Sequence, residues 1–561
     1  MGWKIGVLAA AAVILLLLKS IFDEKARKTR LRLKVHNTFG KPVPAEADTE
    51  RFRSIGAYLQ SLPKRETDLD DITWNDLDME RVFRKLNGTF SAVGEEYLYA
   101  LLHRPSVSET ELTELEDRIR YFSEKEEERD DFGVALSNMG KLRRISVYAY
   151  LVRLKDVPKE SNFVHYSPLV LYIAGIVMLL LGYTGPGLGL IFVTAFYNVI
   201  TYIKRKGQIE PYLQVLSYTV RWISGIRKLA GINDHEDLRR LKRLTDMFRG
   251  MEHGMRLLAP VGVTGGILDL FLDYVRMLTH IDLIKFNRMR YRLTVREPEL
   301  MEMFALCGRL DTAIAIASYR KASEVWCEPE LHFSERVPLT VEELGHPLLS
   351  SPVRNSISTG QSVLLTGSNA SGKSTFLRSV ALAAVMAQTI HTVPARSYSA
   401  SAYHIVSSMS LKDDLLNGES YYIVEIKSIK RILELSNGTL PVLAFIDEVL
   451  RGTNTAERIA ASTEILSFMA ESGMTVFAAT HDLELTGLLE NGFDNYHFSE
   501  LVTDGDIHFD YALKAGRATS KNAIALLTLM EYPEEVTERA AGRVTHFLSS
   551  GEWRNWENEN G

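Results

Sequence analysis

The most hydrophobic stretch of the chain lies close to its N-terminus and predicts a membrane segment. Ile5–Leu18 is an unbroken apolar run, and it extends to about Phe22 if the Lys19 side chain reaches back to the membrane surface. A secretory signal peptide is the competing interpretation, but no small-residue cleavage site follows the run. Between Lys19 and His36 stand seven Lys and Arg residues against two acidic ones. By the positive-inside rule we expect an uncleaved membrane anchor over residues 1–22, with the chain after Lys19 on the cytoplasmic side.

A second uncharged hydrophobic region, Leu169–Ile203, predicts a membrane hairpin. Thr184–Gly187 divides it into two apolar runs, each shorter than the roughly 20 residues that span a bilayer comfortably. Basic residues flank it on both sides, which predicts that both ends of a hairpin at 167–203 are cytoplasmic. They are Lys155, Lys159, Lys204, Arg205 and Lys206. We therefore expect a multi-pass protein of the cell membrane with three membrane segments, the alternative being a buried helical hairpin in a soluble domain.

Charged and apolar residues recur at helical spacing on both sides of the hairpin. The clearest helices before it are Ala92–Leu102 and Glu109–Glu126, and after it the helical character continues through Glu210–Arg256 and Pro260–Phe286. The pattern predicts a mainly helical region in two parts, residues 49–166 and 204–335. Strand and loop character takes over by about Val341, so we expect a further domain at 340–561.

Length and composition add only a few constraints. At 561 residues the chain is too long for one core, and its formal net charge of −6 argues neither for nor against nucleic-acid binding. Cys307 and Cys327 lack metal-ligand spacing and are expected to be reduced, structural thiols. A basic stretch in the second helical part is either a nucleic-acid contact or a solvated helix face. It comprises Arg239, Arg240, Lys242, Arg243 and Arg249.

A glycine-rich loop between a strand and a helix carries the clearest chemical signal. The apolar run Ser362–Thr366 predicts the strand, Phe376–Gln388 predicts the helix, and the segment between them fits the phosphate-loop pattern. The backbone N–H groups of such a loop surround a β-phosphate, Lys373 reaches the β- and γ-phosphates, and the Ser374 hydroxyl ligates Mg²⁺. The sequence therefore predicts a binding site for ATP and Mg²⁺. Its loop residues are Gly367, Ser368, Asn369, Ala370, Ser371, Gly372, Lys373, Ser374 and Thr375.

Two further apolar runs end in residues suited to ATP hydrolysis. Leu443–Ile446 precedes Asp447 and Glu448, and this pattern predicts a strand whose first carboxylate holds Mg²⁺ while the second polarises the attacking water. The alternative for two carboxylates at a strand end is a helix N-cap. Met474–Thr480 predicts another strand, followed by His481, which either senses the γ-phosphate or is structural. Lys373, Glu448 and His481 are thus the candidate catalytic residues.

Together these motifs resemble the MutS-type ATPases. Six segments carry the resemblance in the order of that family: Gly345–Leu348, Thr366–Thr375, Asn417–Ile426, Asp447–Thr455, Ala479–Leu485 and Lys514–Lys521. The resemblance implies an ABC-superfamily P-loop ATPase with an α/β fold, working as a homodimer with composite sites. It further implies that Ser420 approaches the γ-phosphate of the partner's nucleotide and that His481 is the γ-phosphate switch. Arg451–Thr455 would link the acidic strand to the dimer interface, and 77–105 with 290–335 would belong to a helical lever-like domain.

The chain also departs from the family pattern. Ser368–Gly372 stands where the family usually has Pro-Asn-Met-Gly-Gly, and Leu450 replaces a usual glycine after the acidic strand. No room is expected for the mismatch-reading and connector domains, because the predicted anchor begins the chain. The mismatch-wedge pattern Phe-x-Glu occurs at Phe122, Phe333 and Phe498, as short matches do by chance. Orthodox mismatch recognition is therefore not expected.

The sequence leaves three classes of function open. We expect a membrane-anchored, Mg²⁺-dependent ATPase of MutS type that changes conformation on ATP hydrolysis and binds DNA. The alternative is a nucleotide-switched membrane module acting on protein or lipid partners without DNA. A transporter-type ATPase is the third class, but no Leu-Ser-Gly-Gly-Gln-like signature is present and three short spans do not readily line a pathway.

Overall fold

The computed structural model describes most of the chain as two compact units. The described residues are 22, 26–44, 52–142, 144–158, 160–229, 235–251, 267–368, 371–409, 421–438, 440–503, 506–518, 524, 527–528 and 530–553. The helical unit comprises 1–63, 83–101 and 114–322, and the C-terminal unit comprises 64–82, 102–113 and 323–561. Two segments that the sequence groups with the first helical part, 64–82 and 102–113, thus belong to the C-terminal unit. The predicted membrane run Ile5–Leu18 lies outside the described residues.

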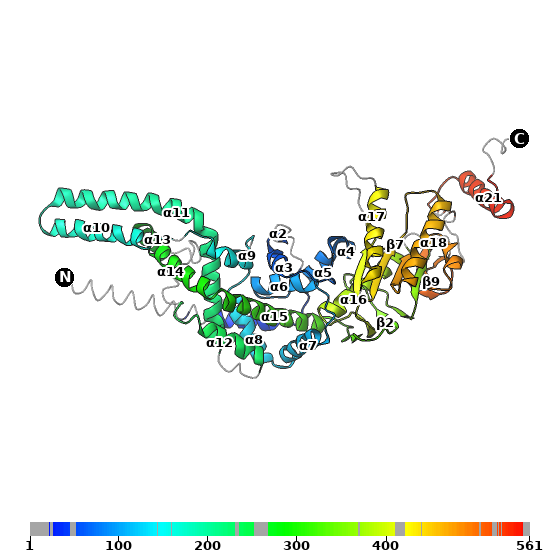
Figure 1. Cartoon of the computed structure of the whole chain (residues 1–561), viewed down its shortest axis with the longest axis horizontal. Helices are drawn as coiled ribbons and strands as arrows, with labels where there is room; N and C mark the ends of the chain where they lie inside the picture. The colour runs from blue at the N-terminus through cyan, green and yellow to red at the C-terminus, as the bar shows by residue number, and fades with distance from the viewer. Residues whose placement is uncertain are drawn as a thin grey trace. The chain divides into compact units, whose positions relative to one another are not determined.

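Helices account for most of the first unit, as their spacing in the sequence predicts (Figure 1). Beside a helix over residues 26–38, it contains all or part of α2 (Phe52–Ile55), α3 (Ala57–Ser61), α5 (Met79–Leu86), α6 (Ala92–Leu102), α7 (Glu109–Glu124), α8 (Glu126–Ser137), α9 (Val147–Val152), α10 (Phe163–Leu180), α11 (Thr184–Arg227), α12 (Glu236–Asp246), α13 (Ile267–Thr279), α14 (Ile281–Val295) and α15 (Glu297–Ala322). The predicted helix Ala92–Leu102 is confirmed at both ends. The predicted helix Glu109–Glu126 is instead two helices, because Lys125 has the non-helical dihedrals φ −93° and ψ 81°.

The core of the helical unit forms where α15 meets the second half of α11. Trp222 and Tyr218 of α11 are fully buried, and the Trp222 indole N–H donates to the sulfur of buried Cys307 at 3.1 Å. Asp311 of α15 is also fully buried and caps the start of α6 by accepting from the backbone N–H groups of Phe90 and Ser91, each at 2.9 Å. These contacts tie α6, α11 and α15 into one core.

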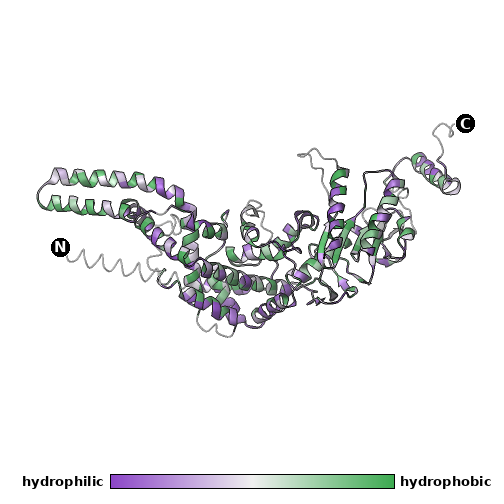
Figure 2. Ribbon diagram, viewed as in Figure 1, coloured by the Kyte–Doolittle hydropathy of each residue, from purple (hydrophilic) through white to green (hydrophobic). Residues whose placement is uncertain are grey.

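The hydrophobic region at 167–203 folds as a helical hairpin made of α10 and the first half of α11. Both helices are long and apolar enough to cross a bilayer, and most of the apolar window in each is not buried within the protein. Figure 2 shows the hydrophobic residues along both arms. The arms approach closely at two glycines, since a Cβ on Gly187 would lie 2.9 Å from the backbone oxygen of Gly175. Small residues at this crossing therefore set the spacing of the hairpin.

The predicted break in this region is displaced. The turn lies at Leu181–Tyr183, and Thr184–Gly187 forms the first turn of α11. Proline is tolerated in a first helical turn because the N–H group it lacks would have no intrahelical partner there. The helix then continues without interruption from the hairpin to Arg227, across the expected border at residue 204.

The C-terminal unit is an α/β fold with mixed sheets. Six of its described strands form one sheet in the order β12-β9-β4-β8-β7-β6, and four form another in the order β1-β5-β2-β3. The strands are β1 (Glu330–His332), β2 (Leu339–Leu344), β3 (Asn355–Thr359), β4 (Ser362–Thr366), β5 (Ser397–Ser401), β6 (His404–Ser408), β7 (Val442–Asp447), β8 (Thr475–Ala479), β9 (Phe493–His497), β10 (Glu500–Thr503), β11 (Asp506–Phe509) and β12 (Lys514–Ala515). The main helices are α4 (Asp71–Asp76), α16 (Lys373–Thr389), α17 (Tyr421–Leu433), α18 (Thr455–Glu471), α19 (Leu485–Leu488) and α21 (Glu534–Ser550).

The centre of the six-stranded sheet is parallel and fully buried. β4 pairs with β8 and β9, and β7 pairs with β6 and β8, all in parallel. The runs predicted as strands at Ser362–Thr366, Leu443–Ile446 and Met474–Thr480 correspond to β4, β7 and β8, which confirms them to within a residue at each end. Because ligands of open parallel sheets bind beyond the carboxyl ends of the strands, the loops after β4, β7 and β8 mark the place to look for a site.

Segment 64–82 covers the β6 edge of this sheet. Asp76 of α4 accepts from the Ser407 hydroxyl and from the Met409 backbone N–H, both at 2.8 Å, while the Thr73 hydroxyl accepts from the Ser407 backbone N–H at 3.1 Å. Asp76, Thr73 and Ser407 are all buried. These bonds satisfy backbone groups that an edge strand would otherwise expose.

Candidate nucleotide site

The loop after β4 has the backbone that its glycines predict. Gly367 has a φ of +144° and Gly372 a φ of +105°, values that side chains of L-residues rarely adopt. A Cβ on Gly367 would lie 2.7 Å from the backbone oxygen of Phe498, so no larger residue fits there. Gly372 is the N-cap of α16, which starts at Lys373. The free N–H groups of the first turn of α16 therefore face the loop, where a phosphate would bind.

Lys373 and Ser371 place polar atoms inside this loop. Lys373 is 5% exposed, and its ammonium group donates to the backbone oxygens of Gly367 at 2.6 Å and Ser368 at 2.7 Å. The Ser371 hydroxyl is buried and finds no hydrogen-bond partner among the described residues. A buried, unsatisfied hydroxyl beside a buried cation suits a phosphate group, which would accept from both. Asn369 and Ala370, also predicted to line the loop, lie outside the described residues.

Ser374 and Thr375 follow on the first turn of α16, half-buried and exposed respectively. Asp447 is the last residue of β7, and its Cα pairs with that of Ala479 at the end of β8. Since β8 lies between β4 and β7, the Asp447 carboxylate and the loop leave the same edge of the sheet, one strand apart. Hard oxygen ligands of this kind suit Mg²⁺, so Ser374 and Asp447 fit the role predicted for them in type and sheet position.

Glu448 is held from two sides by the side chains of a histidine and an arginine. His481 Nε2 lies 3.0 Å from Glu448 Oε1, and Arg451 Nε lies 2.5 Å from Glu448 Oε2. Burial opposes ionisation of this carboxyl, but the hydrogen bond from His481 and the charges of Arg451, His481 and Lys373 together lower its pKa. The backbone adds strain, since Glu448 and Leu450 both have a φ of +59° although neither is glycine. The structure thus brings Glu448 and His481 together as an ionised carboxylate and its partner.

The loop that carries His481 is anchored on both sides. The Thr480 backbone N–H donates to Leu365 of β4 at 2.9 Å, and the next residue but one, Asp482, accepts two bonds from Arg458 of α18 at 2.6 and 2.8 Å. This clamp fixes the position of His481 relative to the phosphate loop. The contact between Arg458 and Asp482 joins residues 24 apart in the chain, so no local pattern in the sequence predicts it.

Two further charged residues near Glu448, one acidic and one basic, were not among the predicted site residues. Glu425 of α17 is 2% exposed, accepts from the Arg451 backbone N–H at 3.3 Å, and has a pKa raised by burial. Arg451 was predicted only to link the acidic strand to a dimer interface, but its side chain also binds Glu448. Ser420, predicted to reach the partner's nucleotide, lies outside the described residues just before α17.

A pocket of about 310 Å³ opens beside the phosphate loop. Gly372, Thr375 and Phe376 form the wall on the loop side, and Tyr511 lies close enough that a Cβ on Gly372 would be 3.1 Å from its ring. The remaining lining is mostly apolar and comes from Leu344, His346, Leu349, Ser351, Pro352, Val353, Asn355, Ser379 and Phe498. A mostly apolar pocket with an aromatic wall suits a planar heterocyclic base whose phosphates occupy the adjoining loop.

Comparisons with known proteins agree with this geometry. Residues 363–548 match the family model of MutS domain V. A relative named DNA mismatch repair protein MutS, from Aquifex pyrophilus, is 31% identical over 275 residues, covering 46% of this chain and 32% of the relative. Another of that name, from Clostridium kluyveri, is 31% identical over 294 residues, which are 48% of this chain and 32% of the relative. DNA mismatch repair protein MutS 2 from Haloarcula marismortui is 32% identical over 181 residues, or 32% and 19% of the two chains. The chain therefore matches a third or less of the length of these relatives.

Proposed function

Because the C-terminal unit carries a MutS domain V, which is a P-loop ATPase domain, we propose that this chain binds and hydrolyses ATP with Mg²⁺ at the site described above. The observation that carries the proposal is the ionised Glu448 carboxylate, which His481 contacts. Glu448 directly follows β7, and only β8 lies between β7 and β4, the strand before the phosphate loop. An ionised carboxylate at this place is what a general base for water needs.

Each described residue has a role in the proposed reaction. Lys373 would exchange its two backbone oxygens for phosphate oxygens, and the Ser371 hydroxyl would gain a partner. Ser374 and Asp447 would hold Mg²⁺, which neutralises charge on the phosphates. The Glu448 carboxylate would orient a water molecule and accept its proton, while His481 would keep that carboxylate in place and contact the γ-phosphate. The pocket beside Tyr511 would hold the base.

Two substitutions test this assignment in the full-length protein in detergent or nanodiscs. Glu448→Gln should retain ATP binding and reduce the rate of hydrolysis by about 10²- to 10⁴-fold, because it removes the base and keeps the shape. Lys373→Ala should weaken ATP binding itself at least tenfold, since it removes a charged phosphate contact. Lys430→Ala, at an exposed lysine of α17, is the matched control and should leave both quantities unchanged. Unchanged turnover in Glu448→Gln would remove that residue from the catalytic role.

We further propose that the ATPase domain works as a homodimer and that DNA binds to the ATP-loaded state. In this proposal the α10–α11 hairpin holds the chain in the cell membrane, with the ATPase domain in the cytoplasm. The names of the relatives support the DNA part, because they are DNA mismatch repair proteins. The exposed apolar arms of the hairpin support the membrane part, and they also favour a second candidate function. In that second function the ATPase switches a membrane module whose partner is protein or lipid.

DNA titrations separate the two functions. Glu448→Gln protein with ATP and Mg²⁺ should bind duplex, branched or single-stranded DNA with an affinity that falls steeply as salt increases. Arg239 and Arg243 are exposed on α12, so replacing both by alanine should lower the salt dependence by about one unit of slope for each arginine that binds a phosphate. Arg539→Ala, at an exposed arginine of α21, is the control. ATP-dependent dimerisation without any DNA binding would instead favour the membrane module.

A further inference from the structure

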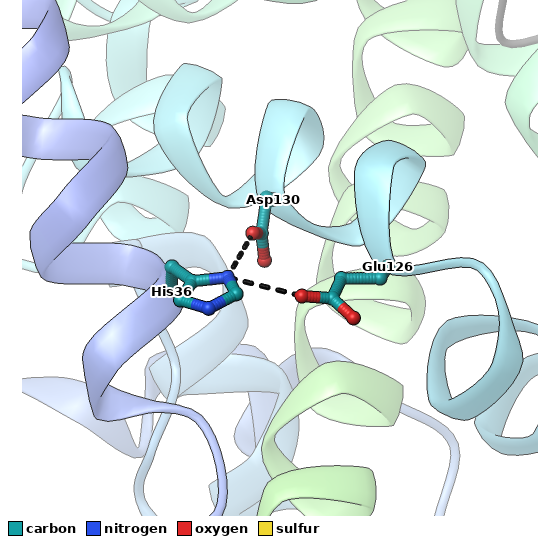
Figure 3. Close-up of side chains that lie close together, drawn as sticks. All are labelled: His36, Glu126 and Asp130. Atoms are coloured by element: carbon teal, nitrogen blue, oxygen red, sulfur yellow. Dashed lines mark hydrogen bonds and ion pairs between the residues drawn. The ribbon is translucent and has the colours of Figure 1, made fainter.

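A cluster of three side chains joins the helix at 26–38 to α8 in the helical unit. His36 comes from the first helix, while Glu126 and Asp130 stand four residues apart on α8 and therefore share one face of it. His36 Nδ1 lies 2.8 Å from Asp130 Oδ2 and 3.2 Å from Glu126 Oε1. Figure 3 shows the imidazole ring directed at both carboxylates. The three potential ligand atoms all lie within 4.8 Å of one another.

The distance of 3.2 Å between His36 Nδ1 and Glu126 Oε1 matches the edge of a metal coordination polyhedron, and the distance of 2.8 Å to Asp130 Oδ2 is somewhat shorter. Around a tetrahedral ion with bonds of about 2.0–2.1 Å, neighbouring ligand atoms are about 3.3 Å apart. A hydrogen bond accounts for the 2.8 Å contact between His36 and Asp130. Because Nδ1 carries at most one hydrogen, it leaves the contact with Glu126 without one. An ion between the three atoms would satisfy all of them at once.

The surroundings of Asp130 resemble the support that metal ligands receive from their neighbours. Arg129 donates to the other carboxylate oxygen, Oδ1, from two nitrogens at 3.3 and 3.2 Å, and its guanidinium group stacks on Phe39 at 3.7 Å. The Asp130 side chain is only 6% exposed, so this arrangement holds Oδ2 toward His36. Beside the imidazole, two carboxylates stand against one arginine, and this excess of negative charge favours a cation.

Packing fixes the approach of the two helices independently of the cluster. Val35, 2% exposed, packs against Gly133 of α8 so closely that a Cβ on Gly133 would lie 2.7 Å from Val35 Cγ1. His36 is the neighbour of Val35, and Gly133 lies one turn beyond Asp130. The ligand atoms are thus held together by apolar contacts, and a bound ion would not have to pull the helices into place.

We propose that His36, Glu126 and Asp130 form a binding site for one divalent transition-metal ion of the Zn²⁺ class. Imidazole nitrogen as a ligand favours such ions over Mg²⁺ and Ca²⁺, which prefer oxygen alone. The His36 and Glu126 side chains are 48% and 59% exposed, so water completes the coordination shell on the outer side. The ion clips the helix that follows the N-terminal hydrophobic run onto α8. This site is separate from the nucleotide site and does not depend on ATP hydrolysis.

Metal titration of the full-length protein tests the proposal. Tag-free protein, treated with a chelator and dialysed, would be titrated with Zn²⁺ by calorimetry and with Co²⁺ by visible absorption, both in excess Mg²⁺. We expect one equivalent to bind in the wild type and in His332→Ala, which changes a partly exposed histidine of the C-terminal unit. His36→Ala and Glu126→Gln should each weaken that binding at least tenfold and abolish the Co²⁺ absorption band of the site.

Further controls distinguish the cluster from other causes. His481→Ala should still bind one equivalent of Zn²⁺, because the nucleotide site does not supply the ligands of the cluster. Far-ultraviolet circular dichroism would establish that both cluster variants are folded, and Glu126 is exposed enough to be replaced without disturbing the core. A wild type that binds no stoichiometric Zn²⁺, or a folded His36→Ala variant that binds it as tightly as the wild type, would overturn the proposal and leave an ion pair only.

Discussion

At the scale of single residues, Arg451 is one of the groups that lower the pKa of the proposed base, Glu448. Its guanidinium group occupies one oxygen of Glu448 while His481 occupies the other. Each carboxylate oxygen can accept a second hydrogen bond, so a water molecule can bind Glu448 beside either partner. Arg451 also lies in the segment that the MutS resemblance assigns to the dimer interface.

A pH profile measures this contribution. Burial alone would raise the pKa of Glu448, and the His481 hydrogen bond with the charges of Arg451, His481 and Lys373 reverses that effect. A base is active when ionised, so removing one of these charges must raise its pKa and move the acidic limb of kcat toward higher pH. We expect that shift in Arg451→Gln and a smaller one in Arg451→Lys. An acidic limb at the same pH in all three proteins would contradict the assignment.

The pKa of Glu96, a buried residue of the helical unit, is shifted in the opposite direction. It is 1% exposed and accepts from the Ser146 hydroxyl at 2.8 Å and from the Val147 backbone N–H at 2.6 Å, which caps the start of α9. Burial raises the pKa of Glu96 to about 8 in spite of these bonds. The folded helical unit therefore binds a proton here that the unfolded chain releases near the ordinary carboxyl pKa.

The sign of the resulting pH effect follows from linkage. Between the unfolded pKa near 4.5 and the folded value near 8, the folded state holds more protons, so raising the pH through this window lowers its stability. The slope has an upper limit of about 1.4 kcal/mol per pH unit. Glu96→Gln removes the titration, so its stability relative to wild type should increase from about pH 5 to about pH 8. Hydrogen exchange in α6 and α9 would measure this, with Glu464→Gln on the exposed face of α18 as the control.

At the scale of elements, the local patterns of the chemical motifs were sufficient to predict their structures. A phosphate loop consists of adjacent residues, so Gly367, Gly372 and Lys373 could be assigned with the strand and helix around them. Contacts between distant residues could not be predicted in this way. Tyr511 lies close to Gly372 and Arg458 clamps Asp482, and no spacing in the sequence records either contact.

Helix boundaries were harder to predict than helices. Lys125 ends α7 through its backbone dihedrals although the apolar spacing continues across it. Thr184–Gly187 was interpreted as a break because glycine and proline usually interrupt helices, yet these residues occupy the first turn of α11, where their lack of backbone partners carries no penalty. The N-terminal anchor and the hairpin's position in a membrane remain predictions.

At the scale of the whole molecule, the hairpin makes a topological prediction. If both of its ends are cytoplasmic, the turn at Leu181–Tyr183 lies on the opposite side of the membrane. Tyr183 is 61% exposed, so Tyr183→Cys in intact cells should react with a membrane-impermeant maleimide. Leu488→Cys, at an exposed position of the C-terminal unit, should react only after the cells are permeabilised. If Tyr183→Cys also required permeabilisation, the hairpin would not cross the bilayer.

The continuity of α11 has a mechanical consequence. Its 44 residues have a contour length of about 66 Å at a rise of 1.5 Å per residue. They run from the hairpin turn to the core around Trp222, and Pro211 lies inside the helix between the two. An interior proline removes one backbone hydrogen bond and bends a helix, so the exposed arm and the buried turns of α11 meet at a bend near Pro211. A force applied to the hairpin would therefore reach the core around Trp222 as a change in the angle at this bend, so Pro211 acts as a hinge in an otherwise continuous helix.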